Sequence, residues 1–131
     1  MSVEQASPAV AVARAHVEAW SNHHWDTARE GLASDVHVRA TTTQPIMKDT
    51  DLTGIDDYMH GLKEFAQAVV PGSLQVDATV GDERNALLMV TVQAALGPGG
   101  AKVTLPAARL YLLDEDDKIE AEHVIFFASQ G

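Results

Sequence analysis

The 131-residue chain contains no cysteine, which excludes disulfide bonds and thiol chemistry. That composition fits the reducing cytoplasm, where we expect the protein to reside. The N-terminal stretch MSVEQASPAV has no basic region, and no apolar run approaches the roughly 18 residues of a membrane span. We therefore expect no signal peptide, no transmembrane segment and no membrane partner.

Basic residues are also scarce, with 9 Lys+Arg against 19 Asp+Glu and a net charge of −10. Nucleic acids and anionic membranes both bind basic surfaces, so neither is an expected partner. The acidity itself identifies no substrate. A chain of this length with 46% hydrophobic residues can bury about two-thirds of its unfolded surface. We predict a single domain over residues 1–131.

Motifs for metals and phosphates are missing as well. The sequence has no His-Glu-x-x-His, and the run from Gly97 to Gly100 is not followed by Lys-Ser/Thr, so it predicts a hairpin loop. The acidic run from Asp114 to Asp117 lacks the spaced ligands and terminal glutamate of a calcium loop, and predicts a tight turn. We expect no metal and no organic cofactor.

Periodicity predicts helices first and strands afterwards. Ser7-Pro8 reads as an N-cap followed by proline at the first helical position. A polar loop is expected over residues 42–54, and a bulge or bend at Pro106. The predicted helices cover residues 8–21, 26–33 and 54–70; the predicted strands cover residues 35–41, 74–80, 86–96, 103–113 and 119–128. This order indicates an α+β protein, an antiparallel sheet packed on helices.

Two adjacent histidines, His23 and His24, lie between the first two predicted helices, within the stretch SNHHWDTARE. A metal pair, a catalytic pair and a structural corner are all conceivable. Adjacent residues point apart, so both rings could face one metal only with a distorted backbone. We interpret them as structural or solvent-facing residues of the corner.

The chain resembles the nuclear transport factor 2-like superfamily, and within it the polyketide cyclase and ketosteroid isomerase branch. The resemblance rests on HVEAWSNHHWDTAREGLASDVHVRA, on Gly54 before the third helix, and on LYLLDEDDKIEAEHVIFF, and it covers about residues 8–128. It implies a cone-shaped curved antiparallel sheet wrapped around three N-terminal helices, a cystatin-like α+β barrel. This fold hosts isomerases, cyclases, dehydratases, epoxide hydrolases and non-enzymes, so it does not define an activity.

The chain departs from the ketosteroid isomerase pattern at each catalytic position. By the resemblance, the oxyanion-hole tyrosine falls on His16, the base on Ala40 and the oxyanion-hole aspartate on Arg109. The usual isomerase mechanism is therefore not expected. Polyketide cyclases pair a histidine with an aspartate near the end of the sheet, but no aspartate follows His123 on its strand. We expect His123 on the convex face of the sheet or at a dimer interface.

A different polar group remains. His16 neighbours the apolar stripe of the first helix, and the resemblance directs Arg109 and Glu122 toward the pocket. Together they would form an acid–base cluster, in which Arg109 holds an oxygen and His16 or Glu122 moves a proton. The alternative is a buried ion pair that orients the sheet, beside a core histidine.

The predicted function is that of a small-molecule pocket protein of the polyketide cyclase-like group. It would be a cofactor-independent isomerase, cyclase or dehydratase acting on an apolar carbonyl compound. The alternative is a non-catalytic homodimeric ligand-binding or assembly module. A homodimer through the outer face of the sheet is expected in either case, because Ile125 and Phe127 point outward. The predicted ligand-binding residues are Trp20, Ala40, Tyr58, Tyr111, Val124 and Phe126, with Tyr58 placed at the pocket rim and His60 at the surface.

Overall fold

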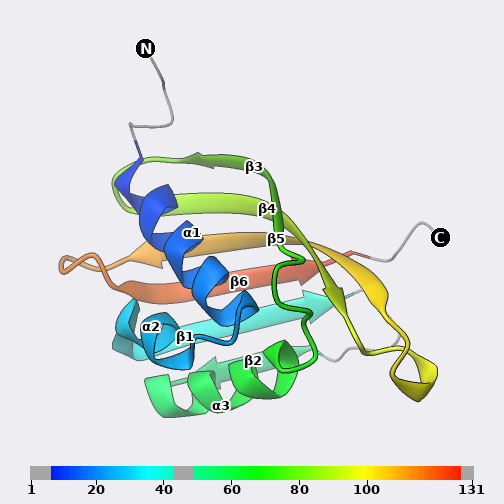
Figure 1. Ribbon diagram of the computed structural model, residues 1–131. Coiled ribbons are helices and arrows are strands. Elements are labelled where there is room, and N and C mark those ends of the chain that lie inside the picture. Colours follow the sequence, from blue (N-terminus) through cyan, green and yellow to red (C-terminus); the bar gives the residue numbers. More distant parts are fainter. Residues whose placement is uncertain (1–6, 43–48, 128–131) are drawn as a thin grey trace.

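The computed structural model describes residues 7–42 and 49–127, and Figure 1 shows helices packed on one side of a curved sheet. The helices are α1 (Pro8–Ser21), α2 (Trp25–Glu30) and α3 (Ile55–Ala66), and a short 3₁₀ turn spans Pro98–Gly100. The strands are β1 (Leu32–Thr42), β2 (Thr50–Thr53), β3 (Gln75–Gly81), β4 (Asn85–Ala94), β5 (Val103–Leu113) and β6 (Ile119–Phe126).

The six strands form one sheet in the order β2-β1-β6-β5-β4-β3. This α+β arrangement of a curved sheet on three helices was predicted. Neighbouring strands pair antiparallel except β1 and β6, which run parallel, so the sheet is mixed and not closed. The parallel pair joins strands from opposite ends of the sequence, and no hairpin sets its direction. Local sequence patterns therefore could not predict that β1 and β6 run parallel.

The predicted first helix matches α1 at both ends. The Ser7 hydroxyl accepts the Val10 backbone N–H at 3.1 Å, and Pro8 occupies the first helical position, where a missing N–H costs nothing. The second helix ends at Glu30, earlier than predicted, because β1 already begins at Leu32. The apolar residues at its expected end belong to the strand and the core.

The loop expected over residues 42–54 was wrong in part, and the bulge that was one alternative at Pro106 is absent. Residues 50–53 are not loop but strand β2, whose mostly exposed residues give no apolar alternation to detect. Pro106 causes no bulge between β4 and β5, where the register continues through it. The Pro106 carbonyl accepts the Phe127 N–H at 3.1 Å. The N–H and C=O of one strand residue point to the same side, so the position of the missing Pro106 N–H also faces the end of β6. Little backbone pairing is lost there. The last residue of the strand predicted to reach 128 lies outside the described residues.

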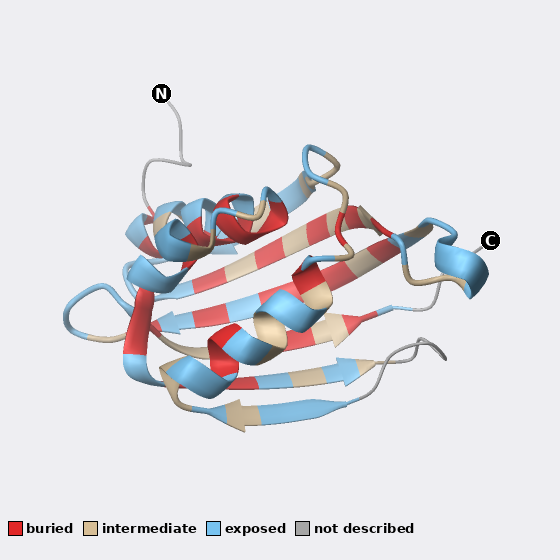
Figure 2. Cartoon of the chain, turned by 60° about the horizontal axis from the view of Figure 1, so that its bottom comes forward, coloured by how far each residue is buried: buried red, intermediate tan, exposed pale blue. Residues whose placement is uncertain are grey.

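Burial alternates along the central strands, as Figure 2 shows by bands of buried and partly buried residues. The inner face of the sheet packs against α1 and α3, and the side chains between these layers form the core. The largest fully buried side chains are Trp20, Leu88, Leu105, Leu113 and Ile119. Within the described ranges, no helix has the length and apolar character needed to cross a membrane.

Candidate functional site

A cavity of about 680 Å³ lies between α3 and the inner face of the sheet. This volume is in the range of sites for small organic molecules. Its mouth is bordered by the exposed residues Asp57, His60 and Glu64 of α3. Its walls are mainly apolar, and they include Val38, Ala40, Leu52, Leu62, Phe65, Leu96, Val124 and Phe126.

Strand register assembles the inner end of this cavity. Arg109 of β5 is opposite Val124 of β6, and Tyr111 is opposite Glu122. On the other side of β6, the parallel pairing places Ala40 of β1 beside Val124. Residues two apart on a strand share a face, so these side chains lie on the inner surface together. Five of the predicted site residues thus come from neighbouring positions on three adjacent strands.

Arg109 and Glu122 form a buried ion pair on the cavity wall. The two side chains are only 4% and 3% exposed, and Arg109 Nη1 is 3.3 Å from Glu122 Oε2. The guanidinium also lies 4.6 Å from the centre of the Trp20 ring and 5.6 Å from that of Phe126, within the range of cation–π attraction. The expected proximity of Arg109 and Glu122 is therefore present.

His16 reaches this pair through Tyr58. Tyr58 Oη lies 2.5 Å from Glu122 Oε1 and 3.0 Å from His16 Nε2. The other ring nitrogen, His16 Nδ1, is 3.0 Å from the backbone oxygen of Ala28 in α2. A continuous hydrogen-bonded chain therefore runs from α2 through α1 and α3 to the cavity wall on β6.

The predicted position of Tyr58 at the rim was wrong. Tyr58 is 2% exposed and occupies the centre of the polar chain, although it also lines the cavity. A sequence signal was available, because Leu62 follows Tyr58 by four residues and Ile55 precedes it by three, which puts all three on one helical face. His60 is exposed at the cavity mouth, as expected.

Burial dominates the electrostatics of the chain. Burial lowers the pKa of His16, although the nearby Glu122 partly opposes this. Burial, reinforced by the charge of Glu122, raises the pKa of Tyr58 and of Tyr111 well above 10. Both phenols therefore stay protonated at neutral pH and act as neutral hydrogen-bonding groups.

Several predicted site residues lie behind the cavity wall. Ala40, Tyr58, Arg109, Glu122, Val124 and Phe126 line the cavity, whereas His16, Trp20 and Tyr111 are packed behind it. Tyr111 Oη lies near Arg109 and Glu122 but lacks hydrogen-bonding geometry to either. Arg109 Nε and Trp20 Nε1 are also buried without a partner in the described part of the chain. Unpaired buried donors are uncommon and mark this corner as polar beyond the needs of packing.

The histidines at the helix corner have separate environments. His23 Nε2 lies 2.8 Å from the Ala66 oxygen and 3.0 Å from the Val69 oxygen at the end of α3, and its ring stacks on Trp25. His24 is exposed. The structural interpretation of this corner is thus confirmed. His123 alternates with the inward-facing Glu122 and Val124 and so lies on the outer face of the sheet.

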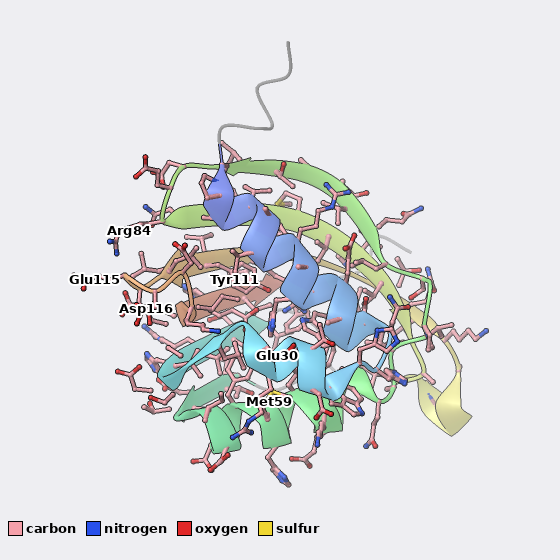
Figure 3. The ribbon with its side chains drawn as sticks, turned by 60° about the vertical axis from the view of Figure 1, so that its left-hand side comes forward. Glu30, Met59, Arg84, Tyr111, Glu115 and Asp116 are labelled. Carbon is pink, nitrogen blue, oxygen red and sulfur yellow. The ribbon has the colours of Figure 1, made fainter. Side chains whose placement is uncertain are left out.

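The acidic run between β5 and β6 forms the predicted hairpin turn. Asp114 Oδ1 accepts the backbone N–H groups of Asp116 and Lys118 at 2.8 and 3.0 Å. Figure 3 shows that the turn end of the sheet carries Arg84, Glu115 and Asp116, whose side chains project away from the part of the sheet that carries Tyr111. No group of three or more His, Cys, Asp or Glu side chains in residues 7–42 and 49–127 is arranged to hold a metal ion.

Comparison with known proteins identifies the fold. Residues 13–122 match the SnoaL-like domain family, which is part of the nuclear transport factor 2-like superfamily. No curated protein matches the sequence.

Solved structures with similar folds carry different functional names. A protein classed as a SnoaL-like polyketide cyclase from Shewanella denitrificans has a TM-score of 0.69 at 11% identity, covering 90% of this chain and 89% of its own. An epoxide hydrolase from Mycobacterium tuberculosis has 0.70 at 17%, covering 90% and 81%. A protein classed as a ketosteroid isomerase from Kribbella flavida has 0.66 at 17%, covering 90% and 76%. At these identities the similarity establishes the fold alone.

Proposed function

The chain belongs to the SnoaL-like domain family, and we propose that it binds a small apolar organic compound bearing a carbonyl oxygen and catalyses proton transfer on it. One observation supports this most: the buried pair Arg109–Glu122, joined to Tyr58, lies on the wall of an otherwise mainly apolar cavity. The apolar walls would hold the carbon skeleton, and the polar corner would receive the oxygen.

The charged pair has no evident structural advantage. Burying two charges costs several kcal/mol of desolvation, and apolar side chains of similar size often stabilise a core equally well. Within the described ranges, Arg109 and Glu122 are the only buried residues among the Asp, Glu, Lys and Arg side chains. Their position on a cavity wall is what an oxygen-binding and proton-transferring site requires.

Each residue then has a defined role. The Arg109 guanidinium, with one unpaired buried N–H, would bind the carbonyl oxygen and stabilise negative charge that develops there. Glu122 would exchange a proton with the bound compound, and Tyr58 would orient that carboxyl group. This proton transfer would convert the carbonyl compound to its enol. Isomerases, cyclases and dehydratases of carbonyl compounds share that first step.

Hydrogen–deuterium exchange tests the shared step without knowledge of the natural substrate. A panel of apolar cyclic ketones would be incubated with the protein in D₂O, and deuterium at the carbon next to the carbonyl would be followed by NMR. We expect faster exchange with the native protein than with Glu122→Gln or Arg109→Met, and no binding of matched hydrocarbons in a thermal-shift assay. Equal exchange by all three folded proteins would refute the proposal.

Arg109→Ala separates this function from a structural role. Loss of ligand binding in a folded variant supports the site, whereas an unfolded variant indicates that the ion pair holds the sheet together. A folded native protein that binds none of the ketones would favour the non-catalytic assembly module instead.

We also propose that the protein is a homodimer formed through the outer face of the sheet. Leu110 and Leu112 of β5 are 49% and 38% exposed, and Phe127, just after β6, is 37% exposed. Clustered apolar side chains on one face are typical of an interface. Sedimentation velocity should find a dimer for the native chain and a monomer for Leu110→Glu, and a monomeric native chain would contradict the proposal.

A further inference from the structure

The cavity changes in character from its inner end to its mouth. At the inner end the charge of Arg109 is compensated by Glu122, 3.3 Å away, so this corner has little net charge and suits a neutral oxygen. Between the two ends the walls are mainly apolar, and the mouth carries acidic side chains. This order of neutral polar, apolar and acidic zones restricts the class of ligand that fits the cavity.

Helix α3 contributes to both the inner wall and the mouth, through two stripes of side chains with Gly61 between them. Each stripe has the three- and four-residue spacing of one helical face. The deeper stripe is apolar except for one hydroxyl, and the outer stripe is polar and exposed; Figure 2 shows exposed and buried residues alternating along this helix. The deeper stripe consists of Tyr58, Leu62 and Phe65, and the outer stripe of Asp57, His60 and Glu64.

The carboxylate of Asp57 is available to a ligand. Asp57 is exposed and lines the mouth, and its side chain makes no ion pair or hydrogen bond within residues 7–42 and 49–127. Asp56, in the same helical turn, does not line the cavity and binds Arg29 at 2.8 Å. The other acidic residue of the mouth, Glu64, lies 3.1 Å from His60 Nε2. Asp57 is therefore the carboxylate best placed to pair with a group of the ligand.

Basic groups that could attract an anion are scarce around the cavity. Among the cavity-lining residues that the structure describes, Arg109 is the only lysine or arginine, and its charge is already paired. The net charge of −10 on the whole chain adds to the negative potential at the mouth. An anionic group placed there would be repelled by Asp57 and Glu64, whereas a cationic group would be attracted by both.

The inner end gives a second, independent indication of a ligand. Arg109 is 4% exposed and lines the cavity, yet its Nε has no partner in the described part of the chain. A buried N–H donor without an acceptor is uncommon. A neutral oxygen of the ligand would give this guanidinium an acceptor without changing the balance of charge at the inner end.

We propose that the ligand is a cationic amphiphile, a carbonyl compound with an apolar skeleton and an ammonium group at the far end. The carbonyl oxygen binds Arg109, the skeleton lies along Leu62 and Phe65, and the ammonium group pairs with Asp57 at the mouth. The inference deepens the proposed function and rests on it for the position of the carbonyl. Asp57 is then a specificity-determining residue that contacts the ligand and takes no part in proton transfer.

Matched ketones test the preference for charge. Each has the same cyclohexanone ring, and the tail opposite the carbonyl ends in trimethylammonium, in tert-butyl or in carboxylate. The first two tails have the same shape, so they isolate the effect of the charge. NMR titration at low ionic strength should find roughly tenfold tighter binding of the ammonium ketone than of the carboxylate ketone, and a smaller difference in about 0.5 M salt. Equal affinities, or tighter binding of the carboxylate ketone, would overturn the inference.

Asp57→Asn locates the source of the preference. It should weaken binding of the ammonium ketone roughly two- to fivefold and leave binding of the tert-butyl ketone unchanged. Asp56→Asn is the matched control, because it removes the same charge from the same turn of α3 at a position that does not line the cavity. Its effect should be much smaller. Equal effects of the two substitutions would indicate the general charge of the helix and would overturn the assignment of Asp57.

Charge reversal at the mouth gives a stronger test. The double variant Asp57→Lys, Glu64→Lys should reverse the order of affinities, so that the carboxylate ketone binds most tightly. Both positions are exposed, so the variant should fold, and circular dichroism would verify this. An unchanged order of affinities in the folded double variant would contradict the proposed ligand class.

The failure of this inference and that of the proposed function give different results. If the tert-butyl ketone binds and exchanges deuterium but the charged tails make no difference, the proposed function stands and the cationic ligand is rejected. If the ammonium tail is preferred equally in the cyclohexane analogue that lacks the carbonyl, and no deuterium exchange occurs, the cationic ligand is supported and the proposed function is rejected.

Discussion

Replacing His23 by alanine should destabilise the protein by about 2 kcal/mol. The His23 ring ties the helix corner to the end of α3 through the oxygens of Ala66 and Val69, 2.8 and 3.0 Å away. Losing this shared N–H donor costs roughly 1 kcal/mol. Losing the stack on Trp25, whose ring centre is 5.1 Å away, costs about 0.5–1 kcal/mol more.

The backbone adds a smaller contribution. His23 has a φ of 64°, a left-handed conformation that histidine adopts more often than alanine does. The summed loss of about 2 kcal/mol corresponds to roughly 7 °C in the melting temperature of a domain of this size.

Urea unfolding followed by tryptophan fluorescence would measure the loss, with His24→Ala as the matched control. His24 is the next residue along the chain and is exposed, so its replacement should change the free energy of unfolding by less than about 0.5 kcal/mol. Equal losses for the two variants would refute the structural role assigned to His23.

Three further predictions concern other parts of the molecule. Both tyrosines of the chain are buried with their pKa raised well above 10, so an absorbance titration should detect no tyrosinate near pH 10 while the protein is folded. Because the unfolded phenols release their protons at about pH 10, stability should be lost as the pH rises past that value, and early tyrosinate formation in a folded protein would contradict this burial. Ser7→Ala removes both the cap on Val10 and a 2.9 Å bond to the Asp82 oxygen, and should lower the free energy of unfolding by about 1–2 kcal/mol in a denaturant titration; an unchanged midpoint would show the cap to be dispensable. In Gly61→Ala the new Cβ would stand 2.7 Å from Leu52 Cδ1 and push that side chain into the cavity. The gain of about 1 kcal/mol in helix propensity should offset the strain, so calorimetry should find near-native stability with weaker ligand binding, and unchanged binding would argue that this wall is not used.

Local sequence patterns were sufficient for much of the architecture. The stripe of α1, its Ser7 cap and the strand from Val103 to Leu113 were predicted with their observed ends. Helix faces, caps and strand alternation depend on residues within a few positions of one another, and a sequence contains that information directly. The resemblance to the superfamily added the direction in which Arg109 and Glu122 point.

Contacts between distant segments were decided by the tertiary structure alone. The parallel pairing of β1 with β6 and the burial of Tyr58 between His16 and Glu122 both depend on how elements 40 or more residues apart pack together. Strand β2 is defined by its pairing with β1 and not by any apolar alternation of its own. No local period encodes such a register, because it follows from burying the inner face of the whole sheet against α1 and α3. The sequence by itself thus determined the fold class and most elements, whereas the hydrogen-bonded chain that leads to the cavity exists only once those elements are packed.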